Sequence, residues 1–329
     1  VYADLSGGTA YRRPIEMWKQ IFTFGGGPHV EAIAKLCFAS DSSFCFQGTY
    51  QFQPFIEFYE RFYEALDVPA EVRELVDHLD DPEVAYCVPR LHREYCTDAV
   101  LAREFVEGVP VTDPSVTGLS QERRNALARG MLELFFYEVY EWGVLQTDPN
   151  FGNYLLRLGD RRKRVAKDEI ALLDFGSVLE CPADFLYHLR RTIAAGQRED
   201  VDGLVDGLIG LGCLQPDASA GGRKLFSDFC LHLLEPLRAP EHLPREYLNE
   251  RGEYCWGRSR LMRRAGKQAA LSTTSRHFTA PSRDFALIAR KLTGVYNFIS
   301  VLDAQFNAHE MVEDHIGRWL QRERHGEQE

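Results

Sequence analysis

Apolar residues recur at helical spacing over most of the second half of the chain. Between residues 120 and 142 the apolar positions share one face of a helix, at Leu127, Met131, Leu134, Phe135 and Val139. Ser120 and Gly143 are residue types typical of a helix N-cap and a helix end, and they bound this segment. Beyond residue 180 the same spacing predicts six helices, near 182–196, 198–211, 223–235, 245–267, 281–300 and 307–323.

Short apolar runs next to polar turns predict strands on both sides of the long helix. Residues 85–91 and 99–106 are predicted to form two strands joined by a turn. After the helix, the run Tyr154-Leu155-Leu156 and residues 170–174 would flank a basic, hairpin-like turn at 160–167. Upstream, residues 31–66 carry aromatic residues at helical spacing and predict a buried helix face. The pattern predicts an α+β fold, with an N-terminal region of residues 1–106 followed by a mostly helical lobe of residues 107–329.

Composition narrows the classes of function. The 329 residues carry a net charge of −11, which argues against a nucleic-acid partner because such proteins need a basic footprint. The eight cysteines form no C-x-x-C pair, so reduced thiols are predicted rather than a disulfide framework or a zinc site. No run reaches the roughly 18 consecutive apolar residues of a membrane-spanning helix. A chain that starts at Val1 is expected to be a fragment or a processed form.

The candidate chemistry lies in a loop and a strand end that follow the long helix. Asp148 and Asn153 in the loop Gln146–Asn153 have the D-x-x-x-x-N spacing of a kinase catalytic loop. Asp174 opens a D-F-G that ends the strand 170–174. Each motif alone arises by chance, but their order, with a long helix before them and a hairpin between them, favours a shared function.

Phosphoryl transfer explains why these residue types are needed. It concentrates negative charge on phosphate oxygens, and Mg²⁺ held against them by hard oxygen ligands neutralises that charge. Asn153 and Asp174 are therefore predicted metal ligands, and Asp148 would orient the attacking hydroxyl or water. Upstream, Glu104 and Val106 are predicted to hydrogen-bond the adenine of ATP through their backbone, as a hinge does. An ordinary strand with a turn is the alternative for that segment.

These segments resemble the UbiB family, the AarF-type atypical kinases linked to ubiquinone biosynthesis. The resemblance is carried by the loop Gln146–Tyr154, by Ala171–Ser177, by Val88-Pro89, by Glu122–Asn125 and by Arg290–Val295. It covers about residues 67–319 and is strongest from 85 to 180. It implies a protein-kinase-like fold with a helical C-lobe and a small, incomplete or remodelled N-lobe.

The chain departs from the family pattern in its N-terminal part. The family carries a Lys-x-Gly-Gln element, an Ala-rich nucleotide loop and an ATP-contacting lysine on a strand, and none of them is found here. Gly25-Gly26-Gly27 followed by Ala32–Lys35 mimics a Gly-rich loop and lysine, but the gap is too short for two strands. Two explanations stay open: the chain begins after these elements, or its N-lobe is remodelled.

The resemblance implies a function and several partners. It predicts an ATPase or atypical kinase that binds ATP and Mg²⁺ and supports the biosynthesis of ubiquinone or another polyprenyl quinone. Quinone-precursor lipid, a membrane surface and other quinone-biosynthesis proteins are the implied partners. The implied location is peripheral, at the cytoplasmic side of a bacterial inner membrane or the matrix side of the mitochondrial one. A catalytically dead pseudokinase that acts as a nucleotide-sensing scaffold and a small-molecule phosphotransferase are the alternatives.

Overall fold

The computed structural model describes residues 84–90, 92, 95, 102–159, 167–175, 177–273 and 281–326. Contacts divide the chain into two units. Unit 1 comprises residues 1–110 and 150–178, and unit 2 comprises residues 111–149 and 179–329. The boundary between Pro149 and Asn150 falls inside the loop that carries Asp148 and Asn153, so each end of that loop is described within its own unit.

Unit 1 contains a three-stranded sheet of order β1-β4-β3. β1 (Val84–Cys87) runs parallel to β4 (Asp168–Leu172), and β3 (Tyr154–Arg157) runs antiparallel to β4. The inner faces of β3 and β4 are apolar and buried, as the alternation of their residues requires. At the hairpin end, the buried Asp168 side chain accepts the Gly159 N–H at 2.7 Å, which holds the two strands in register.

The segment before Gly108 is less regular than its sequence predicts. Within the described part of residues 99–106, no continuous strand forms. The segment still exchanges backbone hydrogen bonds with residues that follow β1, from Glu104 N–H to the Arg90 carbonyl at 2.7 Å and from His92 N–H to the Ala102 carbonyl at 2.9 Å. The predicted pairing of two extended segments is therefore present, but the strand prediction for 102–106 was wrong.

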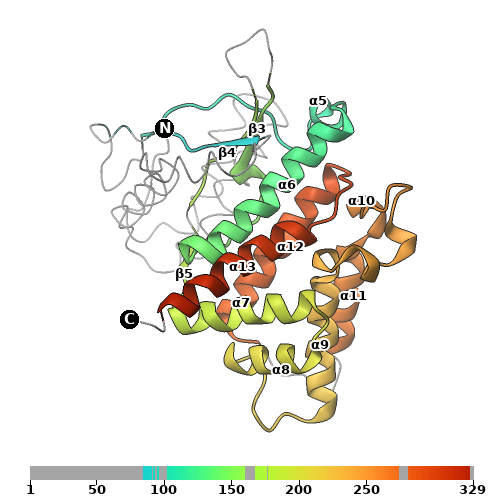
Figure 1. Ribbon diagram of the computed structural model, residues 1–329. Coiled ribbons are helices and arrows are strands. Elements are labelled where there is room, and N and C mark those ends of the chain that lie inside the picture. The colour runs from blue at the N-terminus through green and yellow to red at the C-terminus, as the bar shows by residue number, and fades with distance from the viewer. Residues whose placement is uncertain are drawn as a thin grey trace, which may run out of the picture. The chain divides into compact units, whose positions relative to one another are not determined.

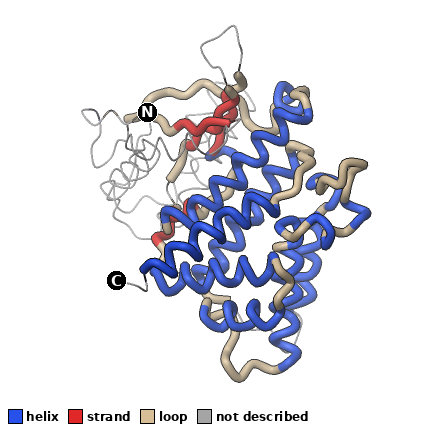
Figure 2. The backbone as a smooth tube through the Cα atoms, viewed as in Figure 1, coloured by secondary structure: helices blue, strands red, loops and turns tan. Residues whose placement is uncertain are grey.

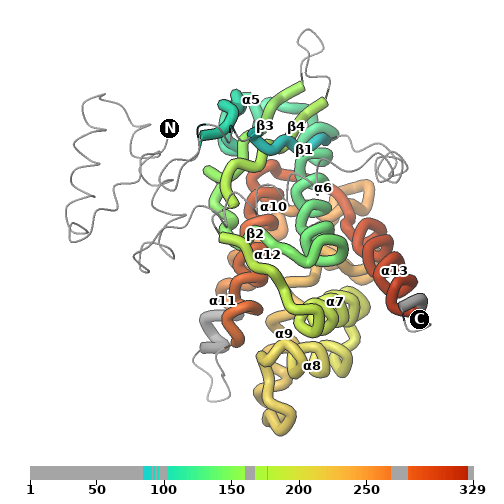
Figure 3. The backbone as a smooth tube through the Cα atoms, turned by 90° about the vertical axis from the view of Figure 1, so that its left-hand side faces the viewer, coloured from blue at the N-terminus to red at the C-terminus, as the bar shows by residue number. Residues whose placement is uncertain are grey.

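Unit 2 is built almost wholly of helices (Figure 2). α6 and α12 pack together along their length, and α13 packs against α6 and α7 (Figure 1). The other end of the unit consists of four helices that pack in succession: α7 contacts α8, α8 contacts α9, and α9 contacts α11 (Figure 3). The longer helices are α6 (Gln121–Tyr137), α7 (Ala183–Gln197), α8 (Val201–Gly210), α9 (Ala220–Leu233), α11 (Leu261–Thr273), α12 (Arg283–Val301) and α13 (His309–Gly326). The short elements are α5 (Pro114–Thr117), η2 (Glu138–Trp142), β2 (Val144–Gln146), η3 (Phe151–Asn153), β5 (Val178–Glu180), η4 (Glu235–Leu237), η5 (Pro240–His242), η6 (Arg245–Tyr247) and α10 (Trp256–Ser259).

The long predicted helix ends in an unusual turn. Ser120 caps α6 by accepting the Arg123 N–H, as its sequence predicts. The last residues, 138–142, form the π-helical turn η2, and Gly143 stops it in the left-handed region at φ 68°. β2 then pairs with β5 in a two-stranded sheet and leads into the loop that carries Asp148. A π-helical turn inside a helix is often found next to a functional site.

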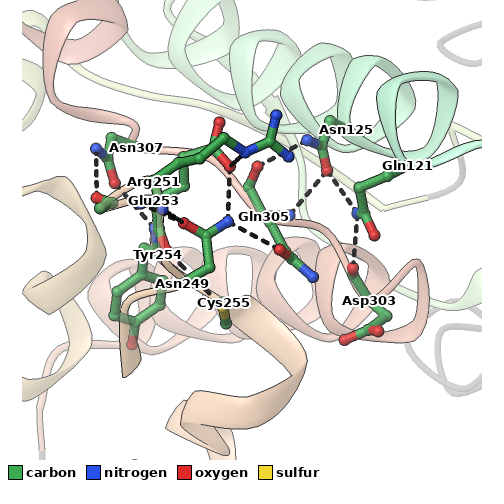
Figure 4. Close-up of polar contacts among 11 residues, drawn as sticks. Gln121, Asn125, Asn249, Arg251, Glu253, Tyr254, Cys255, Asp303, Gln305 and Asn307 are labelled. Carbon is green, nitrogen blue, oxygen red and sulfur yellow. Dashed lines mark hydrogen bonds and ion pairs between the residues drawn. The ribbon is translucent and has the colours of Figure 1, made fainter. Parts of the chain in front are cut away.

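The single helix predicted for residues 245–267 was wrong. The segment forms η6, an irregular stretch, α10 and then α11. A polar network fixes the irregular stretch (Figure 4): the Asn249 amide donates to Glu253 Oε2 at 2.7 Å and to Gln305 Oε1 at 2.9 Å. From α6, the buried Asn125 side chain exchanges two hydrogen bonds with the Gln305 backbone, at 2.7 and 2.8 Å. These tertiary hydrogen bonds override the helical periodicity of the sequence.

Several sequence predictions fall outside the described residues. They include the aromatic helix at 31–66, the Gly-rich segment near residue 26 and most of the basic turn at 160–167. The five cysteines that the structure describes are free thiols: Cys87, Cys181, Cys213, Cys230 and Cys255. None of the helices in the described ranges has the length and apolar character needed to cross a bilayer.

Candidate functional site

The β3–β4 hairpin of unit 1 brings Asn153 beside the start of the D-F-G. Tyr154 pairs with Leu172 across the hairpin, and the Leu173 N–H donates to the Asn153 carbonyl at 2.8 Å. Asn153 therefore lies opposite Leu173, and Asp174 is the next residue along that strand end. Asn153 is buried and Asp174 is half-buried. The backbone pairing thus sets Asn153 opposite the residue before Asp174, at the end of the hairpin where β3 begins and β4 stops.

A tight turn sets the direction in which the chain enters β3. The Asn150 side chain accepts the Gly152 N–H at 3.1 Å, and its carbonyl accepts the Asn153 N–H at 2.9 Å. These bonds form the single turn η3, whose last residue is Asn153. An asparagine that caps its own turn in this way is typical of loops with a fixed shape.

The donor set suits magnesium. An amide carbonyl and a carboxylate are both hard oxygen ligands, and Mg²⁺ takes few ligands from protein and several from water and phosphate. Among the described residues, no cluster of three or more His, Cys, Asp or Glu could hold a metal ion. Two protein ligands leave most of an octahedral coordination sphere to phosphate oxygens and water.

The predicted hinge segment is tied to the same strand end. The Arg103 guanidinium donates to the Leu173 carbonyl, one residue before Asp174. Glu104 is exposed and Val106 is half-buried, and the Glu104 N–H already donates to Arg90. Within unit 1, both Arg103 of the hinge segment and Asn153 are therefore hydrogen-bonded to Leu173, the residue before Asp174.

Asp148 is the part of the predicted site that belongs to unit 2. Its side chain is 6% exposed, and its Oδ1 lies 2.6 Å from Nη2 of Arg290 on α12. A buried carboxylate is costly unless it is paired and hydrogen-bonded. Arg290 supplies that pairing and limits the directions in which the carboxylate can point.

Gln146 fixes the backbone at Asp148. Its side-chain NH₂ donates to the Asp148 carbonyl at 2.8 Å, and its Oε1 accepts from Lys291 Nζ at 3.4 Å. Its backbone N–H donates to Glu138 Oε1 at 3.3 Å. A glutamine amide can donate and accept at once, which suits a residue that joins the loop backbone to a helix lysine.

A fully buried ion pair, Glu138–Lys291, holds the residues that contact Gln146 in place. Lys291 Nζ lies 3.1 Å from Glu138 Oε2, and the two side chains are 1% and 2% exposed. Burial raises the pKa of Glu138, and the charge and hydrogen bond of Lys291 act against that rise. The pair joins α12 to the π-helical turn that precedes β2.

Pro149 packs directly on α12 at Gly294. A Cβ atom added to Gly294 would lie 1.8 Å from the Pro149 Cβ, so only glycine allows this approach. Three positions of α12 therefore hold the loop: Arg290 binds Asp148, Lys291 binds Gln146, and Gly294 seats Pro149. We call these three residues the α12 clamp.

Sequence reasoning found the loop but missed the residues that hold it. Arg290, Lys291 and Gly294 lie in a segment that supports the family resemblance, yet no role follows from it. Their spacing of one and four residues puts them on one side of a helix, which is the signal that was available. No such signal exists for Glu138 or Arg103, because their partners are distant in the sequence.

Comparison with protein families gives one matching domain. Residues 64–207 match the ABC1 atypical kinase-like domain. The chain is 25% identical over 221 residues to the probable serine/threonine-protein kinase abkA of Dictyostelium discoideum, an alignment covering 67% of this chain and 37% of that protein. It is 27% identical over 246 residues to the mitochondrial atypical kinase COQ8B of Rattus norvegicus, covering 74% of this chain and 42% of that one. It is 30% identical over 159 residues to the mitochondrial atypical kinase COQ8 of Saccharomyces cerevisiae, covering 48% and 30%. The chain thus spans less than half the length of each of these relatives.

A solved structure shares the fold. The complex of Rv3197 with erythromycin from Mycobacterium tuberculosis superposes with a TM-score of 0.50 at 20% identity, over 73% of this chain and 54% of that one. The fold is mixed α+β and kinase-like, mostly helical with small sheets, as the sequence predicts.

Proposed function

We propose that the chain, whose residues 64–207 match the ABC1 atypical kinase-like domain, binds Mg-ATP through Asn153 and Asp174. Asp148 orients the hydroxyl or water that attacks the terminal phosphate. Glu104 and Val106 bind the adenine through their backbone, and residues 1–106 and 107–329 act as the N-terminal region and the helical lobe. Bound Mg²⁺ neutralises charge on the phosphate oxygens as it develops.

One observation carries the proposal. The Leu173 N–H donates to the Asn153 carbonyl at 2.8 Å, so Asn153, which carries the amide, lies opposite the residue that precedes Asp174, which carries the carboxylate. Two hard oxygen donors on a rigid hairpin are what a phosphate-bound magnesium needs from a protein. The D-F-G begins at Asp174, directly after Leu173, and Leu173 pairs with Asn153, the last residue of the D-x-x-x-x-N. If the two motifs had arisen by chance, nothing would bring them together in this way.

The chain's own residues assist Asp148 before any acceptor arrives. Arg290 keeps the carboxylate in one orientation, and Gln146 fixes the backbone from which it extends. A preorganised group loses less entropy when the attacking group binds to it. At the hinge, the Glu104 N–H donates to Arg90, so we assign adenine recognition by Glu104 to its carbonyl.

The substrate and location are proposed from the family resemblance of the sequence. In this proposal the protein supports polyprenyl quinone biosynthesis, acts on or near quinone-precursor lipid together with other proteins of that process, and works peripherally at a membrane surface. The relatives named COQ8 and COQ8B, both mitochondrial atypical kinases, support the kinase-like part of this proposal.

ATP turnover tests the proposal. We would measure phosphate release from ATP by the whole chain, with and without vesicles and a phenolic mimic of the quinone head group. Wild type is expected to turn over ATP, and Asp174→Asn to lose at least about tenfold in kcat because a metal ligand is removed. Asp184→Asn, on a side chain that is 87% exposed at the start of α7, is the matched control.

Two outcomes count against the proposal. Turnover that Asp174→Asn leaves unchanged removes the metal assignment. Wild-type chain that binds ATP without releasing phosphate favours the pseudokinase that senses nucleotide.

A further inference from the structure

A basic groove lies in unit 2 between η6 and the start of α11. It is an open cavity of about 480 Å³ lined by Tyr247, Arg258, Ser259, Arg260, Arg263, Arg264 and Lys267. Five of these seven residues are cationic, in a chain whose net charge is −11. Such a concentration of one charge sign in an acidic protein is the feature to be explained.

Three of the cations lie on α11, and a fourth immediately precedes this helix. Arg260 precedes α11 in the left-handed region at φ 47°, and Arg263, Arg264 and Lys267 follow at spacings of three, four and seven residues. Side chains at these spacings are neighbours on a helix surface, and like charges there repel one another. The arrangement therefore works against helix stability unless an anion lies among these side chains.

Among the residues that the structure describes, an acidic side chain pairs with only one of the four. The Arg264 guanidinium forms two hydrogen bonds with the Glu235 carboxylate, at 2.6 and 2.8 Å, and lies over the Tyr247 ring at 4.4 Å. Within the described ranges, no acidic side chain forms an ion pair with Arg260, Arg263 or Lys267. These three side chains are exposed, so their charges face the groove and the solvent.

The walls of the groove are held in place. The Tyr254 hydroxyl donates to Glu235 at 2.7 Å, and the Tyr254 N–H donates to the Asn307 side chain at 3.0 Å. Asn249 is bonded to Glu253 and Gln305 in the network of Figure 4. The Arg258 guanidinium donates to the Leu248 carbonyl. The segment from Tyr247 to Arg258 is therefore a fixed frame, which reduces the entropy that a ligand must overcome.

We propose that the basic groove is a binding site for a phosphate-bearing anion. Arg260 and Arg263 present planar guanidinium groups that can each donate two hydrogen bonds to a phosphate, and Lys267 adds a point charge. Arg264, already bound to Glu235, forms the floor together with the Tyr247 ring. A cavity of this size accommodates a small phosphate ester or a lipid headgroup, and the two share the chemistry that the groove recognises. This site is independent of the proposed Mg-ATP site, because it uses none of the same residues.

Titration with pyrophosphate in the absence of Mg²⁺ tests the site. Calorimetry at low ionic strength is expected to show binding by the wild-type chain, and about tenfold weaker binding by Arg263→Gln/Lys267→Gln. Arg283→Gln/Arg324→Gln removes the same charge from two exposed helix positions elsewhere and should bind within about twofold of wild type. Circular dichroism of both variants checks that the helices are intact.

A second measurement identifies the source of the phosphate. The chain is sedimented with phosphatidylglycerol vesicles and with phosphatidylcholine vesicles, with and without competing pyrophosphate. Binding to phosphatidylglycerol that pyrophosphate and Arg263→Gln/Lys267→Gln both abolish identifies a headgroup; pyrophosphate binding without vesicle binding identifies a soluble ligand. Either result supports the site. The proposal is overturned if wild type binds neither pyrophosphate nor anionic vesicles. It is also overturned if the two double variants lose the same amount of pyrophosphate affinity.

Discussion

Asp148 and Arg290 show how one residue of the loop depends on a partner far along the chain. They lie 142 residues apart in sequence, and their side chains are 2.6 Å apart. The arginine is half-exposed while the carboxylate is buried, so solvent can reach the pair only from the arginine side. The ion pair therefore both orients the carboxylate and offsets the cost of burying it.

Arg290→Gln is expected to lower kcat for ATP turnover by about ten- to one-hundredfold, because a charge-assisted hydrogen bond is worth about 1.5–3 kcal/mol. The KM for ATP should change little, since Arg290 is assigned to Asp148 and not to the nucleotide. Steady-state kinetics on purified chain measures both quantities.

Arg290→Lys provides the comparison for that variant. It keeps the charge without the guanidinium geometry, and an intermediate kcat is expected. A rise in kcat for Arg290→Gln would contradict the assignment, because it would mean that the ion pair holds Asp148 in an unproductive orientation.

The candidate site residues could be predicted from the sequence by their type and spacing. The side chains that bond to them could not. Asp148, Asn153 and Asp174 stand out because kinase chemistry needs those groups in that order, and their roles stay predictions. Glu138 and Lys291 are 153 positions apart, and nothing local in either segment indicates that they pair. Long-range ion pairs depend on which helices pack together. Hydrophobic periodicity predicts which face of a helix is buried, but not which helix packs against it.

At the scale of elements, α12 holds the loop through the α12 clamp. Gly294 matters because it lacks a side chain where Pro149 packs. Glycine within a helix costs about 1 kcal/mol relative to alanine, so its presence here needs a reason. The contact with Pro149 supplies one.

Gly294→Ala is expected to reduce both activity and stability. The added Cβ would meet Pro149 at 1.8 Å, and relief of this clash must move either α12 or the loop. Overpacking of this kind costs about 1–3 kcal/mol. Urea unfolding and ATP turnover would measure the two effects.

Gly317→Ala on α13 is the matched control for this change. A Cβ there meets nothing within 4 Å, so the variant should be as stable as wild type or more stable by up to about 1 kcal/mol. If both alanine variants behave alike, the close approach of Pro149 to α12 is not what Gly294 provides.

The Glu138–Lys291 pair ties α12 to the π-helical turn η2. Lys291→Met leaves a buried carboxylate unpaired and should lower the free energy of unfolding by about 3–5 kcal/mol at neutral pH. Burial raises the pKa of Glu138, and without Lys291 nothing in the pair opposes that rise. The folded variant then binds a proton more tightly than the unfolded chain, so its deficit should shrink as pH falls from about 7 toward the unfolded glutamate pKa near 4.3.

Urea titrations of Lys291→Met and wild type at several pH values would measure this dependence. Glu138→Leu/Lys291→Met, which removes both charges, should be less destabilised than Lys291→Met and should lack the extra pH dependence. A deficit for Lys291→Met that stays constant with pH would contradict the assignment of the unpaired charge to Glu138.

Helix positions were predictable where the apolar period is sustained and the ends carry capping residues. Ser120 and Gly143 bound the first helix as predicted, and α7, α9, α12 and α13 lie within a few residues of their predicted positions. Residues 245–267 broke the prediction because Asn249 and Tyr254 bond to residues beyond 300. A periodic pattern carries no information about such bonds.

At the scale of the whole molecule, the α+β, kinase-like fold predicted from the sequence is confirmed, and residues 64–207 match the ABC1 atypical kinase-like domain that the sequence resembles. The predicted domain boundary at residue 106 remains a prediction. The contact-based units instead assign residues 150–178 to the same unit as the N-terminal part of the chain. Sequence order alone could not suggest this, because strand pairing of 84–87 with 168–171 joins segments separated by the whole of α6.

The most direct test of the account is the Mg²⁺ dependence of ATP binding by the whole chain. Calorimetry should show that Mg²⁺ tightens ATP binding by wild type and by Asp184→Asn, while Asp174→Asn and Asn153→Ala lose about tenfold or more of that gain. An affinity that is the same with and without Mg²⁺ in wild type, or that Asp174→Asn leaves unchanged, would contradict the claim that these two residues hold a nucleotide-bound magnesium ion.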